Sequence, residues 1–168
     1  MEGQVALRPP AATDTDFLRT LFESTREREL AALPDDAAFR QMFITLQHDA
    51  QRRSYAANHP HGDDKIIDVD GEAQGRLYVD RGAEIIEIVD ISLVPACRNR
   101  GVGTRLLQDL AAEAARRGVA LGLRVAVSNP AQRLYERLGF RSVESDGVYR
   151  RLVKDPPRIA DRQREGVP

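Results

Sequence analysis

The sequence predicts an α/β domain in which helices flank a mixed central β-sheet. Apolar residues recur in the order strand, two helices, three strands, helix, strand, helix and closing strand. Residues 84–94 are apolar on both faces, which is typical of a central strand. The length of 168 residues suits one domain with its own core.

The first elements are a short strand and two helices. Residues 5–8 are an apolar segment that ends at a Pro-Pro pair, which favours an edge strand. N-cap side chains at residues 13–16 begin a helix with Phe17, Leu18, Leu21 and Phe22. A second helical pattern starts at residues 34–36 and contains Phe39, Met42, Phe43 and Leu46. The polar span 48–64 contains Asn, Pro and Gly and is predicted to be a loop.

Strand spacing returns at residue 65. Residues 66–69 and 76–79 are two strands joined through Asp70-Gly71, a dipeptide typical of hairpin turns. The long strand 84–94 follows them. The next apolar stripe has helical spacing and contains Val102, Leu106, Leu107, Leu110 and Ala114.

Glycine and asparagine mark the ends of the last helices. Gly118 ends the helix that follows the long strand, and residues 119–127 alternate as a strand. Asn129 is the predicted N-cap of the last helix, with Pro130 at its first position and Gly139 just past its end.

The last predicted elements are one or two strands at residues 140–153. The domain therefore spans residues 1–154, and the polar residues 155–168 are expected to form a flexible tail. The N-terminus has no apolar signal region, and no apolar run reaches the length of about 20 residues that a bilayer requires. We therefore expect a cytoplasmic protein without a membrane partner.

The charge balance excludes general attraction to polyanions. Lys and Arg number 25 against 26 Asp and Glu, so we expect no nucleic-acid partner, and any bound anion must be captured locally. The single cysteine, Cys97, excludes an internal disulfide. His48, His59 and His61 lie in a polar stretch without metal-ligand spacing, so we expect solvated histidines and no metal.

Residues 98–103 join the long strand to a helix and predict a pyrophosphate site. A helix N-terminus offers unpaired amides and the positive end of its dipole. Gly101 and Gly103 remove Cβ atoms that would keep an anion from the backbone, and Arg98 and Arg100 add positive charge. A tight turn without a ligand is the alternative. The P-loop and dinucleotide patterns fit worse, because Gly-Lys-Ser/Thr and a third glycine are both missing.

Two motifs resemble the GNAT superfamily of acetyl-CoA-dependent N-acetyltransferases. The first is Ile91-Ser92-Leu93-Val94-Pro95 followed by Arg98-x-x-Gly101-x-Gly103. The second is similar to the family's later motif and reads Asn129-Pro130-Ala131-Gln132-Arg133-Leu134-Tyr135-Glu136-Arg137-Leu138-Gly139-Phe140. The span from the first motif to the second, residues 91–140, is about a third of the chain, and the motifs have the family's order and usual separation. The resemblance implies a GNAT-like acyl-CoA N-acyltransferase fold and an acyltransferase that uses acetyl-CoA.

The resemblance also implies a role for each motif residue. The backbone of Ile91, Ser92 and Leu93 would pair with the pantetheine arm and polarise the thioester carbonyl. The pyrophosphate would be bound by Arg98, Asn99, Arg100, Gly101, Val102 and Gly103. Tyr135 would protonate the departing thiolate, and a core tyrosine is the alternative. Asn129 stands two positions before Ala131 where the family has three, so it is either a cofactor contact or only a helix cap.

Direct transfer to an amine requires a proton acceptor. Asp90 precedes the pantetheine-pairing residues and is the preferred carboxylate, with Glu87 less favoured and a purely structural Asp90 as the alternative. Gln51, Arg52 and Tyr55 are candidates for substrate contact or a solvated face. Cys97 has no visible His or Asp partner, so we expect a bystander thiol rather than a nucleophile.

The sequence predicts direct acetyl transfer, through a ternary complex, to a small-molecule or peptide amine. A non-catalytic module that binds acyl-CoA, as a sensor or interaction partner, is an alternative from another class. Tyr135 favours the enzyme, because a degenerate member of the family need not keep the acid. A different acyl donor or an alcohol acceptor is also compatible with these residues. Since dimers are common in this family, a homodimer is one of the oligomeric states expected.

Overall fold

The computed structural model describes residues 3–157. Its strands are β1 (Val5–Arg8), β2 (Asp63–Val69), β3 (Glu72–Arg81), β4 (Ile85–Leu93), β5 (Ala120–Ala126), β6 (Arg141–Ser145) and β7 (Tyr149–Lys154). Its α-helices are α1 (Thr15–Ser24), α2 (Glu27–Ala31), α3 (Ala37–Asn58), α4 (Val102–Arg117) and α5 (Gln132–Arg137), and two short 3-10 helices are η1 (Ala12–Asp14) and η2 (Pro95–Cys97).

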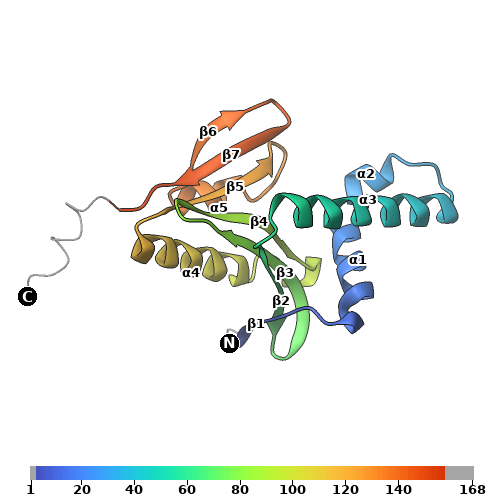
Figure 1. The fold of residues 1–168 in the computed structure, drawn as a ribbon. Coiled ribbons are helices and arrows are strands. Elements are labelled where there is room, and N and C mark those ends of the chain that lie inside the picture. Colours follow the sequence, from blue (N-terminus) through green and yellow to red (C-terminus); the bar gives the residue numbers. More distant parts are fainter. Residues whose placement is uncertain (1–2, 158–168) are drawn as a thin grey trace, which may run out of the picture. The chain divides into compact units, whose positions relative to one another are not determined.

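The strands form one seven-stranded sheet in the order β1-β2-β3-β4-β5-β7-β6 (Figure 1). The β4–β5 pair is parallel, whereas the pairs β1–β2, β2–β3, β5–β7 and β6–β7 are antiparallel. The predicted α/β class with a mixed sheet is therefore confirmed. β4 stands at the middle of the order, as its two apolar faces predicted.

The described residues divide into two compact units, residues 3–79 with 90–102, and residues 80–89 with 103–157. In the first unit β1, β2 and β3 pair antiparallel, and α1 contacts α3. Asp70 and Gly71 have φ angles of 55° and 84°, so the predicted hairpin has the left-handed turn that matches strand twist. The core of this unit includes Leu21, Phe22, Ile44, Ile66, Ile67 and Leu77.

The predicted loop at residues 48–64 is wrong over most of its length. α3 begins after its N-cap Asp36, whose carboxylate accepts from the Phe39 amide at 3.0 Å, and it continues to Asn58. Residues 48–58 contain no Gly or Pro, and their polar side chains suit a solvated helix face. The predicted apolar stripe is also largely uncovered, because Met42 and Leu46 are 53% and 58% exposed.

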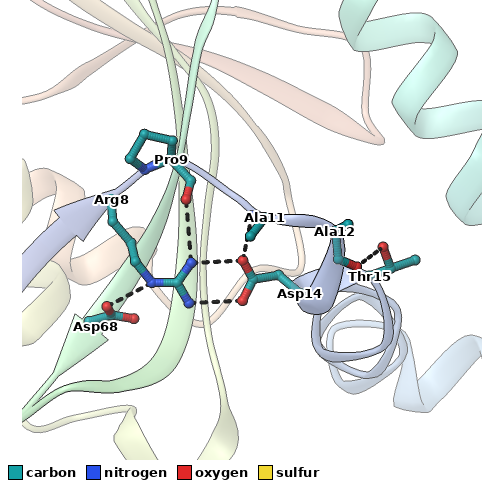
Figure 2. A network of polar contacts seen from close by, with 7 residues as sticks. All are labelled: Arg8, Pro9, Ala11, Ala12, Asp14, Thr15 and Asp68. Atoms are coloured by element: carbon teal, nitrogen blue, oxygen red, sulfur yellow. Dashed lines mark hydrogen bonds and ion pairs between the residues drawn. The ribbon is translucent and has the colours of Figure 1, made fainter.

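Arg8 links the first strand to the first helix (Figure 2). Its Nη1 and Nη2 donate to the two carboxylate oxygens of Asp14 at 2.7 and 2.8 Å, and its Nε donates to Asp68 Oδ2 at 2.9 Å. Asp14 also accepts from the Ala11 amide at 2.7 Å. The Arg8 guanidinium holds the pKa of Asp14 at about 2. Asp14 therefore fixes the turn between β1 and α1 rather than acting as a free N-cap.

In the second unit, four residues of β4, Ile85–Ile88, pair with Ala120–Leu123 of β5. The apolar stripe predicted for α4 is buried throughout. Gly118 and Gly139 have φ angles of 67° and 86°, which confirms them as helix-ending glycines. The closing segment forms two strands, β6 and β7.

The C-terminal tail predicted at residues 155–168 lies largely outside the described residues. Residues 155–157 belong to no helix or strand. Within residues 3–157, no helix is both long enough and apolar enough to cross a membrane.

Candidate functional site

The end of β4 is held against β3 within the first unit. The Val94 amide donates to Gln74 O at 2.9 Å. A Cβ atom on Gly75 would clash with the backbone oxygen of Ser92, so only glycine allows this close approach. The segment containing Ile91, Ser92 and Leu93 is therefore an extended strand supported along β3.

The turn after β4 contains backbone amides that bind no acceptor of the described residues. Cys97 N donates to Val94 O at 2.9 Å and Arg98 N donates to Pro95 O at 3.2 Å, which closes η2. Asn99 and Gly101 then have left-handed φ angles of 58° and 85°. Among residues 3–157, no protein acceptor binds the amides of Arg100, Gly101 and Val102. Left-handed turns that leave neighbouring amides unbound form anion-binding concavities.

The Arg98 side chain holds this turn in place. Its Nε donates to Leu93 O at 2.9 Å, and its Nη2 lies 3.2 Å from both the carbonyl and the hydroxyl oxygen of Ser24 at the end of α1. Arg98 thus joins the end of β4 to α1. Arg100 is exposed in the same turn. The Arg98 guanidinium is engaged by oxygens of Leu93 and Ser24, so pyrophosphate binding by these two side chains stays a prediction.

Asp90 faces Arg76 of β3, which a second carboxylate holds. Arg76 donates from Nε and Nη2 to the two oxygens of Asp64 at 2.8 Å each, and its Nη1 lies 3.8 Å from Asp90 Oδ2. The guanidinium also lies over the rings of Tyr55 and Tyr78, 5.6 and 5.4 Å from their centroids. Arg76 is 7% exposed, so these partners replace its lost hydration.

Burial raises the pKa of Asp90 to about 6, although Arg76 opposes this shift. The Asp90 side chain is 21% exposed, which leaves it accessible to a proton donor. Glu87, the other polar residue of β4, forms a two-point ion pair with Arg151 of β7. Glu87 therefore has a structural role, since its ion pair links β4 to β7. Asp90 is the β4 carboxylate with a perturbed pKa.

His48 is not solvated, so the sequence-based expectation for this histidine is wrong. It is 6% exposed and lies 5.3 Å from the Phe22 ring, between centroids. Burial, and then the charges of Arg52 and Arg76, lower its pKa. The correction follows from the length of α3, because position 48 lies one turn after buried Ile44 on the same helix face.

A cavity of about 250 Å³ opens beside His48 in the first unit. Its polar lining residues come from α3 and from the β2–β3 hairpin, and its small and apolar ones come from the β1–α1 segment. The lining residues are Pro10, Ala11, Ala12, Thr15, Leu18, His48, Arg52, Asp64 and Arg76. The sequence pattern predicted Arg52 as a candidate substrate contact but did not indicate Asp64 or Arg76. One signal could have indicated Arg76: a single arginine stands next to the apolar strand residues 77–79. An arginine buried in a strand requires a carboxylate partner.

Gly103, Asn129 and Tyr135 belong to the second unit. Gly103 lies in the first turn of α4. The predicted N-cap at Asn129 is wrong, because α5 begins at Gln132 after Ala131. Asn129 Oδ1 instead accepts from the Ala131 amide at 2.8 Å, which closes the turn before the helix.

Tyr135 is the buried residue of α5. It is 5% exposed and meets the Phe140 ring edge-on, with centroids 5.8 Å apart. This packing suits a core tyrosine, and the acid role implied by the family resemblance stays a prediction. Cys97 is 4% exposed within η2. Among the described residues, no group of three or more His, Cys, Asp or Glu side chains gathers as metal ligands.

Comparisons with known proteins agree on one family. The model of the acetyltransferase (GNAT) family matches residues 18–140. No curated protein matches the chain in sequence. Solved structures share its fold.

The PaiA N-acetyltransferase of Thermoplasma acidophilum, in complex with coenzyme A, is 16% identical with a TM-score of 0.68, over 90% of this chain and 99% of that one. An acetyltransferase of Thermus thermophilus is 22% identical with a TM-score of 0.66, over 92% and 99%. The ribosomal-protein-S18-alanine N-acetyltransferase of Escherichia coli is 21% identical with a TM-score of 0.58, over 92% and 94%. Because the family model covers more than half of the chain, the protein belongs to the GNAT family of acetyltransferases and is an acyltransferase.

Proposed function

We propose that the protein transfers an acetyl group from acetyl-CoA directly to an amine within a ternary complex. The observation that supports this most strongly is the exposed turn after β4, where the amides of Arg100, Gly101 and Val102 have no acceptor among the described residues. A diphosphate is the anion that such a turn at a helix N-terminus suits. The Thermoplasma acidophilum structure, which has the same fold, is a complex with coenzyme A.

The backbone of Ile91, Ser92 and Leu93 would pair with the pantetheine arm. The turn from Arg98 to Gly103 would bind the pyrophosphate, and Asn129 remains a candidate contact. Acetyl-CoA supplies an activated thioester, whose C–S bond breaks as the amine nitrogen bonds to the acetyl carbon. A backbone N–H that donates a hydrogen bond to the thioester oxygen would stabilise the developing negative charge by about 3 kcal/mol.

Asp90 would accept the proton that the amine loses. Its pKa of about 6 leaves it mostly ionised at neutral pH, so it can act as a base. Tyr135 would donate the proton that the departing sulfur requires. One proton thus leaves the nitrogen and one reaches the sulfur, so the exchange balances. The acceptor class is a small-molecule or peptide amine, and a homodimer stays a prediction.

Calorimetry with acetyl-CoA, followed by a thiol-release assay over a panel of amines, tests this function. We expect Tyr135→Phe to reduce turnover by about 10²–10⁴-fold while coenzyme A affinity is kept. Tyr149→Phe is the matched control, because Tyr149 is 42% exposed on β7. Unchanged turnover in Tyr135→Phe would reject the acid role. Absence of acetyl-CoA binding would reject the proposed function itself.

A further inference from the structure

The cavity beside α3 contains two polar side chains that the protein leaves without partners. Within residues 3–157, neither ring nitrogen of His48 nor any guanidinium nitrogen of Arg52 has a hydrogen bond or ion pair. His48 is nevertheless more than nine-tenths buried. The ring lines the cavity, so its nitrogens are available to a polar group bound there.

His48 and Arg52 are positioned to act on one ligand. They are four residues apart on α3, so their side chains lie on neighbouring turns of one helix face, and both line the cavity. Arg52 is exposed, so the cavity reaches solvent at this residue. A guanidinium fork beside an imidazole N–H is a donor set suited to a carboxylate.

The charges of the cavity wall favour one negative charge. Arg52 and Arg76 contribute two guanidinium groups, and Asp64 contributes one carboxylate. The lowered pKa of His48 keeps its ring neutral at neutral pH. Asp49 and Arg19 also act on the pKa of His48, in opposite directions. Asp64 and Asp90 already balance Arg76, so Arg52 is the guanidinium of the wall without an ion pair among residues 3–157. One carboxylate would pair with it, whereas a phosphate dianion would bring a second negative charge close to Asp64.

The rest of the wall suits a short methylene chain. Pro10, Ala11, Ala12 and Leu18 present apolar surface, and the Arg8–Asp14 clamp holds their segment in place (Figure 2). The cavity volume of about 250 Å³ exceeds the roughly 150 Å³ that accommodates benzene. It therefore has room for a small organic molecule in addition to its polar group.

We propose that this cavity binds the carboxylate of the amine acceptor through Arg52 and His48. This inference rests on the proposed acetyl transfer, because it assigns the acceptor of that reaction to the class of small amino carboxylates. Arg76 connects the two parts of the site: it lines the cavity and lies 3.8 Å from Asp90, the proposed base. An acceptor bound in the cavity is thus one side chain away from Asp90.

Matched amines test the assignment. We expect kcat/KM for γ-aminobutyrate and δ-aminovalerate to exceed that for butylamine and pentylamine by at least about tenfold, because a charge-assisted pair is lost in the alkylamines. Arg52→Gln should remove this preference. Arg53→Gln is the control and should keep it, since Arg53 is an exposed neighbour on α3 that does not line the cavity. Equal use of both amine classes, or an unchanged preference in Arg52→Gln, would overturn the proposal.

A binding measurement separates this proposal from the proposed function. If no amine is acetylated, the function fails, and the cavity is tested by titrating valerate while following the His48 ring protons by NMR. A shift that Arg52→Gln abolishes and Arg53→Gln keeps supports the carboxylate site. No shift in the wild-type protein, or tighter competition by inorganic phosphate, overturns it.

Discussion

Asp90 combines a cost to stability with its proposed role as the proton acceptor. In the folded protein its pKa is about 6, against 3.8 for an ordinary aspartate. Between these values the folded carboxyl keeps a proton that the unfolded chain has released, so stability falls as pH rises from about 4 to about 6. Above that window the buried charge is fully present.

We therefore expect Asp90→Asn to be more stable than wild type above pH 6, by up to about 3 kcal/mol. The gain should shrink below about pH 4, where both states of the wild-type carboxyl are protonated. Urea unfolding at several pH values measures this difference. The same variant should lose acetyl transfer, since the amide cannot accept a proton. A stable variant with full turnover would show that Asp90 is structural only.

Arg76 offers an independent check on the same carboxylate. Its charge lowers the pKa of Asp90, so Arg76→Gln should move the acidic limb of the kcat/KM profile to higher pH. Far-UV circular dichroism must first show that this variant is folded, because the change leaves Asp64 without its bidentate partner. If the acidic limb of the profile does not move, Asp90 is not the proton acceptor.

At the scale of the element, the turn after β4 depends on the left-handed backbone at Gly101. A Cβ there meets no atom within 4 Å, but its φ of 85° is unfavourable for an L-residue. Gly101→Ala should cost about 1–2 kcal/mol of stability and weaken coenzyme A binding, because the amides would turn away from the phosphate.

Gly147 gives a matched control for this change. It lies in the β6–β7 turn with a φ of 86°, and a Cβ there also meets nothing within 4 Å. Gly147→Ala should lose similar stability and keep its coenzyme A affinity in calorimetry. Equal loss of affinity in both variants would mean that strain alone, and not the turn, affects binding.

The β1–α1 connection depends on a single carboxylate. The pKa of Asp14 is held at about 2, below the ordinary 3.8, so its ion pair with Arg8 stabilises the fold above about pH 4 and is lost as pH falls towards 2. We expect Asp14→Asn to unfold at lower urea concentration than wild type at pH 7. The two midpoints should converge by about pH 2, and a constant difference would point to packing rather than charge.

For the whole molecule, binding of acetyl-CoA should add stability by mass action. At a ligand concentration 100 times Kd, the gain is about 2.7 kcal/mol. For a chain of this size, each kcal/mol corresponds to about 2–4 °C in Tm, so a shift of about 5–11 °C is expected. Differential scanning fluorimetry measures this shift. Pantetheine, which lacks the pyrophosphate, is the control ligand. An equal shift with that ligand would contradict binding through the pyrophosphate.

The hairpin turn at Asp70-Gly71, the stripe of α4 and the central place of β4 could all be read from the sequence. Each depends on residues that are neighbours in the chain, whose backbone sterics and spacing act locally. The extent of α3 could not be read in this way. The polar second half of α3 resembles a loop in composition. Only the burial of Ile44 and His48 in the folded protein shows that this segment is a helix packed against the core.

The α/β class, the positions of most elements and the two motifs of the GNAT family follow from the order of the amino acids alone. The polar partners emerge only in the folded chain: Asp64 with Arg76 and Asp90, Glu87 with Arg151, and the buried His48 against the cavity. The reason is that desolvation and ion pairing depend on which side chains strand register and helix packing bring together: the ion-paired residues come from different strands, and His48 is buried against Phe22 of another helix.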